Sequence, residues 1–298
     1  MSGLQISYFE ASARKRLSGL VDTNSFTEYC PPELRQTSPH LALLGSPLAF
    51  DDGVVVGRAT LAGHSILIAA QEGRFNGGSV GEIHGAKICG LLDKALVKKP
   101  AAVLLLVDSG GVRLHEANAG LIAISEIMRA VLRVQDAGIP VLAFVGGSCG
   151  AFGGMGIVTR LCTEIVMSEQ GRLGLSGPEV IETVKGVDEF DSRDRALVWR
   201  ITGGKLRRAL GEATLLVDDL IPAFRSAAEE LLKRYQALPL ITDDLDTLTA
   251  VQTKLENRNK RFANARDGRD IWQATFADAS RVPDLTVSEF NHQLGALS

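Results

Sequence analysis

Two glycine-rich segments, Ser109–Arg113 and Gly146–Gly154, have the clearest capacity for chemistry in this chain of 298 residues. Each follows a continuous apolar run, Ala102–Val107 or Val141–Val145, of the kind that forms a strand buried on both faces. A glycine-rich turn between a strand and a helix leaves unpaired backbone N–H groups at the positive end of the helix. Two such turns on adjacent strands can direct N–H groups at one oxygen, which binds a phosphate or stabilises an enolate or tetrahedral oxyanion.

Several well-defined binding motifs are absent from the sequence. Gly203-Gly204-Lys205 is followed by Leu206, so it does not complete a phosphate-binding P-loop, and no strict GxGxxG fingerprint follows a strand. The five histidines are scattered and form no HExxH motif, so no metal is expected. His115 and Glu116 follow the first turn, where they could serve in acid–base chemistry or, equally, cap the helix or form an ion pair.

The second turn also contains a G-x-S-x-G pattern, Gly146-Gly147-Ser148-Cys149-Gly150, as a nucleophile elbow would. A serine hydrolase built on Ser148 would need an acid and a histidine further along the chain. Only His292 follows, with Asp278 or Asp284 before it, and the C-terminal stretch shows no strand to carry them. A serine hydrolase with Ser148 as nucleophile therefore stands as an alternative.

The elements that must position these turns alternate between strands and helices. The chain order predicts right-handed crossovers, a largely parallel sheet and an α/β fold. Further strands are predicted at Val54–Ala59 and Ser65–Ala70 (a hairpin or neighbouring pair), Thr163–Met167, Leu173–Leu175 and Leu215–Val217. Helices are predicted at Ala11–Leu20, Pro178–Val184, Ser192–Ile201, Ala223–Ala237 and Thr247–Ala265.

Two more helices are predicted on either side of Ala102–Val107. The first follows Asn76–Ser79, with Ser79 as its N-cap, and carries an apolar face of Ile88, Leu91, Leu92, Ala95 and Leu96. The second carries an apolar face of Leu121, Ile124, Met128, Val131 and Leu132. Both are expected to lie on the sheet between successive strands.

Composition and charge set the broad class. The formal net charge is −3, which gives no electrostatic footprint for nucleic acid or an acidic membrane, and the longest apolar stretch, Ile139–Val145, is too short to span a bilayer. Met1–Leu20 has no apolar core of a signal peptide. The four cysteines form no cluster and are expected to be reduced, mostly buried thiols of a cytoplasmic protein. One core domain is expected over 1–298, with an N-terminal extension at 1–45 and a C-terminal helical extension at 240–298.

Three motifs then point to a family: Phe75–Gly81 (FNGGSVG), Ser109–Ala117 (SGGVRLHEA) and Gly174–Glu182 (GLSGPEVIE). Their order and spacing resemble those of the carboxyltransferase β subunits of acyl-CoA carboxylases, within the crotonase superfamily. The resemblance implies a ClpP/crotonase-like spiral of ββα units, here with helical additions at both ends. The N-terminal four-cysteine zinc ribbon of those bacterial subunits is missing, since Cys30 stands alone, and no biotin-attachment Met-Lys-Met is present.

The second turn and Trp199–Lys205 resemble, more narrowly, the β subunits of malonate decarboxylases. That resemblance implies a carboxy-lyase subunit that converts malonyl-S-acyl-carrier-protein to acetyl-S-acyl-carrier-protein and CO2. No cofactor is expected to bind directly, because the substrate is carried on the pantetheine-type (phosphoribosyl-dephospho-CoA) arm of the carrier protein. The implied partners are a γ subunit (a second crotonase-fold chain that shares the active site), the acyl carrier protein and an acyl-transferase subunit. Two alternatives share the fold: a biotin-dependent carboxyltransferase subunit, and a scaffold that only completes its partner's site.

The resemblance also implies an oxyanion hole for the thioester enolate. One N–H donor is expected from Gly111 or Val112 and the other from Gly150 or Ala151, with Phe152 and Gly153 also open because of an apparent one-residue insertion. Substrate contacts are expected from Gly77, Gly78, Ser79, Gly110, Arg113, Ser176, Gly177 and Pro178. A basic set is predicted either to meet the carrier protein or to form a solvated helical face: Arg193, Arg195, Arg200, Lys205, Arg207 and Arg208.

Overall fold

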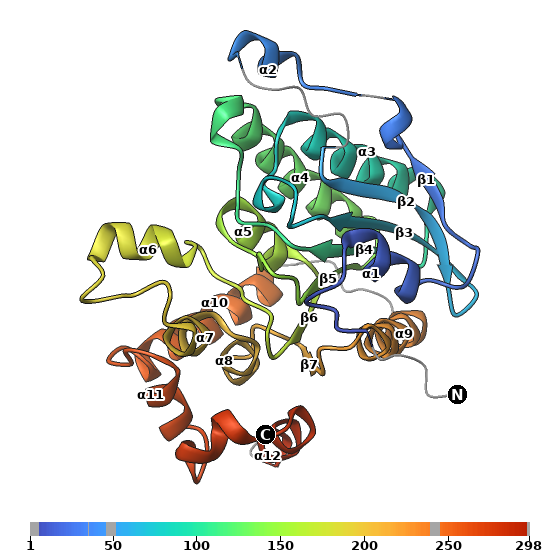
Figure 1. Ribbon diagram of the computed structural model, residues 1–298. Helices are drawn as coiled ribbons and strands as arrows, with labels where there is room; N and C mark the ends of the chain where they lie inside the picture. Colours follow the sequence, from blue (N-terminus) through green and yellow to red (C-terminus); the bar gives the residue numbers. More distant parts are fainter. Residues whose placement is uncertain (1–5, 35, 46–51, 239–244, 297–298) are drawn as a thin grey trace.

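One twisted sheet organises the molecule (Figure 1). The computed structural model describes residues 6–34, 36–45, 52–238 and 245–296. Its seven strands lie side by side in chain order, antiparallel from β1 to β3 and parallel from β3 to β7. The strands are β1 (Thr27–Tyr29), β2 (Val54–Leu61), β3 (His64–Gln71), β4 (Ala102–Val107), β5 (Val141–Val145), β6 (Glu164–Ser168) and β7 (Leu215–Val217).

The predicted hairpin is confirmed as β2 and β3, which pair antiparallel from Val54↔Gln71 to Leu61↔His64. Its two-residue turn, Ala62-Gly63, has φ values of 50° and 79°. Two successive positive φ values match the right-handed twist of the flanking strands, which explains why a glycine stands in the turn.

The parallel half carries the glycine turns. β4, β5 and β7 have the predicted bounds, and β6 is shifted by one residue. Val107 pairs with Val145, so both strands end at the same level and their turns emerge together at one edge. The predicted strand at Leu173–Leu175 is wrong: Leu173 makes only an isolated bridge to Ala151, because this segment crosses to the second turn instead of extending the sheet.

Helices cover both faces of the sheet. They are α1 (Ala13–Leu20), α2 (Pro39–Leu43), α3 (Glu82–Lys98), α4 (Ala119–Asp136), α5 (Gly153–Leu161), α6 (Pro178–Lys185), α7 (Arg195–Thr202), α8 (Gly204–Ala209), α9 (Ile221–Ala237), α10 (Leu245–Arg261), α11 (Gly268–Gln273) and α12 (Val287–Gly295). Short 3-10 turns lie at Pro32–Leu34, Asn76–Gly78, Leu114–Glu116 and Ala279–Asp284. None of the described helices is long and apolar enough to cross a membrane.

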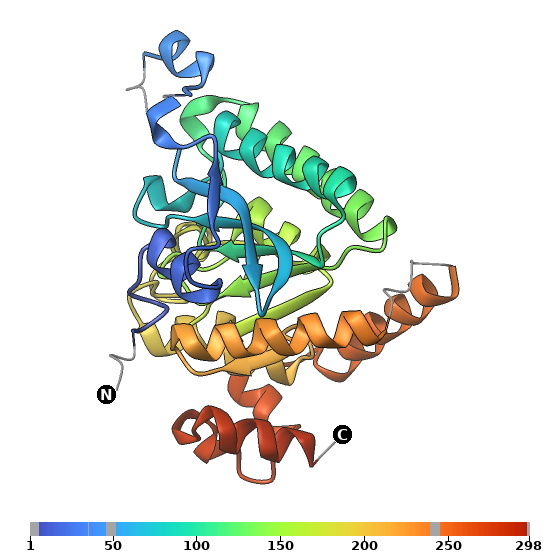
Figure 2. The same ribbon diagram turned by 90° about the vertical axis from the view of Figure 1, so that its right-hand side faces the viewer.

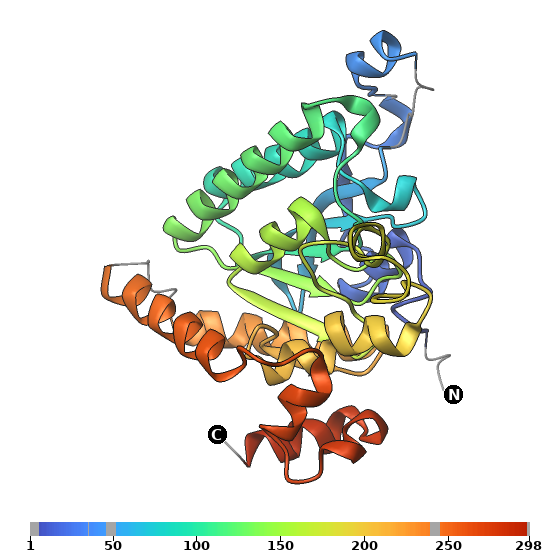
Figure 3. The ribbon, with the colours of Figure 1, turned by 90° about the vertical axis from the view of Figure 1, so that its left-hand side faces the viewer.

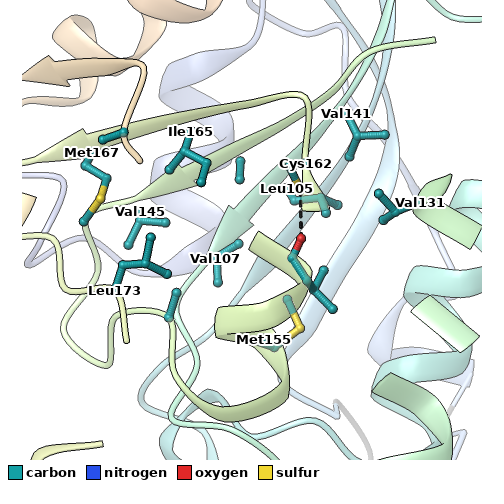
Figure 4. Packing of buried hydrophobic residues seen from close by; sticks show 14 of the residues in the cluster. Leu105, Val107, Val131, Val141, Val145, Met155, Cys162, Ile165, Met167 and Leu173 are labelled. Atoms are coloured by element: carbon teal, nitrogen blue, oxygen red, sulfur yellow. Dashed lines mark hydrogen bonds between the residues drawn. The ribbon is translucent and has the colours of Figure 1, made fainter. Parts of the chain in front are cut away.

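The two faces of the sheet have separate cores. On one face α3, α4 and α5 pack on alternate strand residues, and Figure 4 shows Leu105, Val107, Val145 and Met155 within this cluster. On the other face α1 and α9 cover the remaining residues, such as Leu104 and Phe144. Figure 2 shows α9 on the side of the sheet opposite α3 and α4. The predicted α/β fold is therefore confirmed, with a mixed sheet covered by helices on both faces.

Two details of the helices differ from the sequence-based predictions. Leu121 and Leu132 were expected on the buried face of α4 but are 57% and 47% exposed, because the stripe that includes Ile127 and Val134 meets α3 and the sheet. Ser79 was expected to cap α3, but that helix begins at Glu82 after Gly81, and the Ser79 hydroxyl donates to the Asn76 carbonyl. The predicted apolar face of α3 is otherwise confirmed, with Leu96 only partly buried.

The C-terminal helices pack beside β7 and α8 (Figure 3). Lys205 was placed among the surface cations, but it is fully buried, and its ammonium donates to the carbonyls of Val282, Pro283 and Leu285. It thereby binds the C-terminal segment to the core. The division into extensions at 1–45 and 240–298 stays a prediction, and 239–244 lie outside the described residues. All four cysteines are described, and Cys162 alone is buried, so the expectation of mostly buried thiols is wrong.

Candidate active site at two glycine turns

The two glycine turns touch each other at the carboxyl ends of β4 and β5. The Ser109 N–H donates to the Gly150 carbonyl at 2.7 Å, and the Phe152 N–H donates to the Ser109 carbonyl at 2.9 Å. A Cβ added to Gly153 would lie 3.2 Å from the Cα of Gly111. Adjacent parallel strands thus bring the two segments into contact, as the sequence predicts.

The first turn presents one open N–H group. The Gly110 N–H donates to the Gly77 carbonyl at 2.9 Å, and the Gly111 N–H makes a long contact of 3.3 Å with the Ser109 hydroxyl. The Val112 N–H has no acceptor within the described part of the chain. Gly111, directly before it, has φ +136°, a conformation that side chains rarely adopt, which explains why a glycine stands there. Of the two predicted first donors, Val112 is therefore the open one.

The second turn corrects the predicted donors. Four successive N–H groups already donate to carbonyl oxygens: Gly150 to Gly147, Ala151 to Arg172, Phe152 to Ser109 and Gly153 to Leu175. Gly150 and Ala151 are therefore not free to bind a substrate oxygen, and neither are Phe152 and Gly153. Helix α5 begins at Gly153, and within the described residues the N–H groups of Gly154 and Met155 have no acceptor, as expected in the first turn of a helix. These open N–H groups could be predicted from the sequence only if the first residue of α5 were known.

Arg113, at the end of the first turn, forms a buried network with two carboxylates and two backbone carbonyls. It is 2% exposed, and its guanidinium donates to the Asp52 carboxylate at 2.6 Å and to the Glu116 carboxylate at 2.9 Å. Further donations go to the carbonyls of Asp52 at 2.8 Å and Ser79 at 3.1 Å. The predicted substrate contact by Arg113 is not supported, because the guanidinium is buried and already donates to protein oxygens. These bonds hold the first turn in position. Of the two roles left open for Glu116, the ion pair is confirmed, while His115 is exposed.

A neutral histidine completes this network. His84 is fully buried in α3, with its ring nitrogens 2.8 Å from the Asp52 carbonyl and 3.0 Å from the Gln71 amide. Burial, reinforced by the nearby positive charge of Arg113, lowers the pKa of His84 to about 3. Burial also raises the pKa of the Asp52 carboxyl, against the opposing effect of Arg113. The first turn thus rests on a buried set of charged and polar side chains drawn from three parts of the chain.

The other predicted substrate contacts fall into two groups. Gly77, Gly78 and Gly110 come together at the first turn, where Gly78 packs on the Asp108 carbonyl so closely that a Cβ would overlap it. The segment 176–178 lies next to the second turn, because the preceding Leu175 carbonyl accepts the Gly153 N–H. Gly177 and Pro178 begin α6, and Ser176 is partly exposed. A substrate contact by these residues, and by Ser79, stays a prediction.

The geometry around Ser148 does not suit a hydrolase. A nucleophile elbow is a strained turn that leads directly into a helix, but Ser148 has no positive φ and α5 begins only at Gly153. A cavity of about 700 Å³ beside it is lined by Phe9, Ser148, Gln170, Arg172, Ser192, Arg193, Arg195, Val198 and Trp199, with no histidine among them. His292 lies exposed on α12, in the C-terminal segment. The predicted alternative therefore has neither the backbone conformation nor the base that it requires.

Asp108 is a buried residue of this site that the sequence-based reasoning did not single out. Its side chain is 1% exposed; one carboxylate oxygen accepts the Cys149 N–H and the other accepts from Arg16, each at 2.7 Å. Its position directly between β4 and the first turn could have identified Asp108 from the sequence as a residue of the site. Among the described residues, no three His, Cys, Asp or Glu side chains gather as a metal site would require.

A mixed sheet whose parallel strands end in two touching glycine turns places the chain among α/β proteins with backbone N–H groups suited to an anionic oxygen. Residues 10–200 match the carboxyl transferase domain, and the chain belongs to that family. It is 37% identical over 300 residues to the malonyl-S-ACP:biotin-protein carboxyltransferase MADC of Malonomonas rubra, which covers 95% of this chain and 94% of that protein. It is 30% identical over 184 residues to the methylmalonyl-CoA carboxyltransferase 12S subunit of Propionibacterium freudenreichii, covering 62% of this chain and 34% of that protein.

Solved structures give the same placement. A chain of the crystal structure of a Pseudomonas malonate decarboxylase hetero-tetramer in complex with malonate aligns with a TM-score of 0.79 and 37% identity, over 90% of this chain and 96% of that one. A chain of the Pseudomonas malonate decarboxylase MdcD-MdcE hetero-dimer aligns with a TM-score of 0.67 and 33% identity, over 86% and 99%. The fold is thus that of carboxyl transferase domain proteins.

Proposed function

We propose that this chain is a malonate decarboxylase subunit that decarboxylates a malonyl thioester carried by an acyl carrier protein. The observation that carries the proposal is the pair of unpartnered N–H groups, Val112 and Gly154, on two turns that touch. Neither N–H has an acceptor in the described part of the chain, and Gly153 lies against Gly111, so we expect both groups to reach one oxygen atom. The carbonyl oxygen of a thioester fits such a pair, because fixed donors stabilise it as it gains negative charge.

The chemistry follows from where the charge goes. When the bond between the carboxylate carbon and C2 of the malonyl group breaks, CO2 leaves and the electron pair moves into the thioester, forming an enolate oxygen. A proton then adds to C2 and gives the acetyl thioester. Each backbone donor in such a hole typically contributes about 3 kcal/mol to stabilisation of the transition state, and the positive end of α5 adds to it. No directly bound cofactor is required by this sequence of steps.

The relatives support the malonyl thioester as substrate. The Malonomonas rubra protein is named for malonyl-S-ACP, and the Pseudomonas hetero-tetramer structure contains malonate. We extend both to this chain, with the substrate presented on the pantetheine-type (phosphoribosyl-dephospho-CoA) arm of a carrier protein that an acyl-transferase subunit loads.

A second crotonase-fold subunit is part of the proposal. Helix α6 projects from the body of the molecule beside the second turn (Figure 1). Leu175, Val180 and Val184 along this segment are 67%, 55% and 81% exposed. Apolar side chains gathered on a projecting helix beside a catalytic turn favour cover by another protein. The Pseudomonas relative is described as a hetero-dimer, so we expect this chain to be active only with its partner.

Removal of one backbone donor tests the site. Proline at 154 deletes the N–H and is tolerated in the first turn of a helix, but a Cβ there would lie 2.7 Å from Ile124. The double variants Ile124→Ala/Gly154→Pro and Ile124→Ala/Gly154→Ala therefore form a matched pair that differs in the donor. In the assembled complex, the proline variant should release CO2 from malonyl-carrier protein about 10²–10³ times more slowly than the alanine variant. Equal rates for the two variants would show that the Gly154 N–H is not a donor of the oxyanion hole. If the wild-type complex released no CO2, the proposed function would be wrong.

Transfer of the carboxyl group to biotin is the second candidate, favoured by the name of the Malonomonas rubra relative. The oxyanion hole serves both reactions, because both break the same bond. The discriminating measurement is CO2 release with and without an added biotinyl protein. CO2 released without biotin supports the decarboxylase. Conversion to the acetyl thioester only when the biotinyl protein is present, with the carboxyl group recovered on biotin instead of as CO2, supports the carboxyltransferase.

A further inference from the structure

Asp108 connects the two glycine turns. It lies directly between β4 and Ser109, so its backbone leads into the first turn. Its carboxylate reaches the second turn and accepts the Cys149 N–H at 2.7 Å. The same carboxylate accepts from Arg16 at 2.7 Å, and both side chains of this pair are nearly inaccessible to solvent. One buried carboxylate therefore contacts both halves of the site.

The space around Asp108 shows that the site is built to hold it. A Cβ added to Gly147 would overlap the carboxylate, and a Cβ added to Gly73 would lie 2.5 Å from one of its oxygens. Neither glycine has a positive φ, so clearance around Asp108, and not backbone conformation, accounts for them. This gives Gly147 of the G-x-S-x-G pattern a role without a nucleophile.

Arg16 supplies the opposing charge from the N-terminal helix α1. It is 2% exposed, and its guanidinium also donates to the carbonyls of Tyr8 at 2.7 Å and Phe9 at 3.1 Å. Each donation fixes one direction of the planar guanidinium, so its position relative to Asp108 is over-determined. A buried carboxylate without this partner would pay a large desolvation cost and lose its orientation.

We infer that the Arg16–Asp108 pair is the positioning device of the oxyanion hole, holding the turn before α5 at a fixed place relative to the Gly111–Val112 turn. The inference rests on the proposed function. Neither residue contacts the reacting atoms; both act through the Cys149 N–H and the backbone on each side. Since an oxyanion hole works only when both donors meet one oxygen, small displacements of one turn lower the rate without removing the substrate contacts.

The first test is Asp108→Asn, which keeps the shape of the side chain. An asparagine has a single carbonyl oxygen, so either Cys149 or Arg16 loses its acceptor. In the assembled complex, kcat for malonyl-carrier protein should fall about tenfold to a hundredfold, as for the loss of one charge-assisted hydrogen bond. KM should stay within about threefold of the wild-type value. Arg16→Gln should produce the same split between kcat and KM, and Arg16→Lys should recover part of kcat.

Arg225→Gln is the matched control. Arg225 on α9 also ties the N-terminal extension to the core, through donations to the carbonyls of Leu20 at 3.0 Å and Val21 at 2.6 Å and to Asp22 at 2.6 Å. It does not contact either turn in the described structure. If the pair merely attaches the extension, Arg225→Gln and Arg16→Gln will lower kcat equally, and the inference is overturned. An unchanged kcat for Arg225→Gln, with a reduced kcat for Arg16→Gln, supports it.

Hydrogen–deuterium exchange of the chain separates this inference from the proposed function. In Asp108→Asn and Arg16→Gln, exchange in peptides that cover 146–154 should be at least about tenfold faster than in the wild type, while Arg225→Gln should leave them unchanged. Faster exchange together with a wild-type complex that releases no CO2 would reject the proposed function and retain the coupling between pair and turn. Unaltered exchange in all three variants would reject the coupling itself.

Discussion

The two glycine turns meet at one point, yet glycine is required in them for different reasons. At Gly111 the φ of +136° excludes a side chain although a Cβ would find its nearest neighbour 3.9 Å away. At Gly147 the conformation is ordinary, but a Cβ would overlap the Asp108 carboxylate. Gly111 is therefore required by its own backbone conformation, and Gly147 by the carboxylate that lies against it. The second turn contains both kinds of glycine, because Gly150 and Gly153 have φ values of +72° and +56°.

The bracing of the turns also differs. At the first turn the contacts are mainly those of buried side chains: Arg113 pairs with Glu116 of its own motif and with the distant Asp52. The second turn is held by backbone bonds to residues remote in sequence, such as Arg172 and Leu175, and by Asp108. Variants of each brace should therefore separate a stability defect at the first turn from a positional defect at the second.

Arg113→Met should give the largest effect. It removes the cation between the Asp52 and Glu116 carboxylates, and a buried charge without its partner typically costs about 3–5 kcal/mol. The free energy of unfolding of the isolated chain in urea measures the loss. The control is Arg129→Met on α4, whose ion pair with Glu126 is exposed, and which should leave the unfolding free energy unchanged. Similar values for the two variants would show that the first turn does not depend on this brace.

Gly147→Ala should be the next in size. The added methyl group must displace the Asp108 carboxylate, and overpacking of this kind costs about 1–3 kcal/mol. Gly90→Ala on the exposed face of α3 is the control, because its Cβ meets nothing within 4 Å and should stabilise the helix by about 0.5–1 kcal/mol. Thermal unfolding of both variants should therefore shift in opposite directions, and a shared direction would contradict the packing account of Gly147.

The pH dependence of stability should report the first turn. His84 has a pKa of about 3 when folded, well below the value of an exposed histidine. Between these two values the unfolded chain binds a proton that the folded chain does not, so stability is lost as the pH falls from about 6.5 toward 3. The loss from this one group should reach about 1.4 kcal/mol between pH 7.5 and 5.5. Urea unfolding of His84→Asn at both pH values should show a dependence smaller by that amount; an equal dependence would mean that His84 is protonated when folded.

The same contrast explains what the sequence predicts. The predicted strands Ala102–Val107 and Val141–Val145 match the structure to the residue, because strands buried on both faces are continuous apolar runs. The Val112 N–H is open, and its role as a donor stays a prediction. The donors at Gly150 and Ala151 were wrong because their acceptors, the carbonyls of Gly147 and Arg172, depend on how the turn and the following segment cross in space. Neither the periodicity of the sequence nor the spacing of its motifs predicts a backbone hydrogen bond of this kind.

The exposed face of α4 gives a second reason. Leu121 and Leu132 belong to an apolar set that the helical period predicts to be buried, yet they face outward. A single chain has one sheet to cover and cannot bury two apolar stripes of one helix. Periodicity identifies that α4 is amphipathic, but the choice between stripes is made by packing against α3 and β5.

Ser148→Ala should have the smallest effect and decides whether the second turn acts through its backbone or through a side chain. The contact that Ser148 makes with Arg172 uses its carbonyl, which alanine retains. Loss of this part-buried hydroxyl should change kcat for CO2 release by less than about twofold, because the proposed donors are backbone N–H groups. The measurement is the steady-state rate of the assembled complex with malonyl-carrier protein, with Asp108→Asn assayed in parallel as the slowed reference. If Ser148→Ala abolished the reaction while Asp108→Asn spared it, the hydroxyl would be the reacting group. The second turn would then work by nucleophilic attack, and the absence of a positive φ at Ser148 would have to be reconciled with that chemistry.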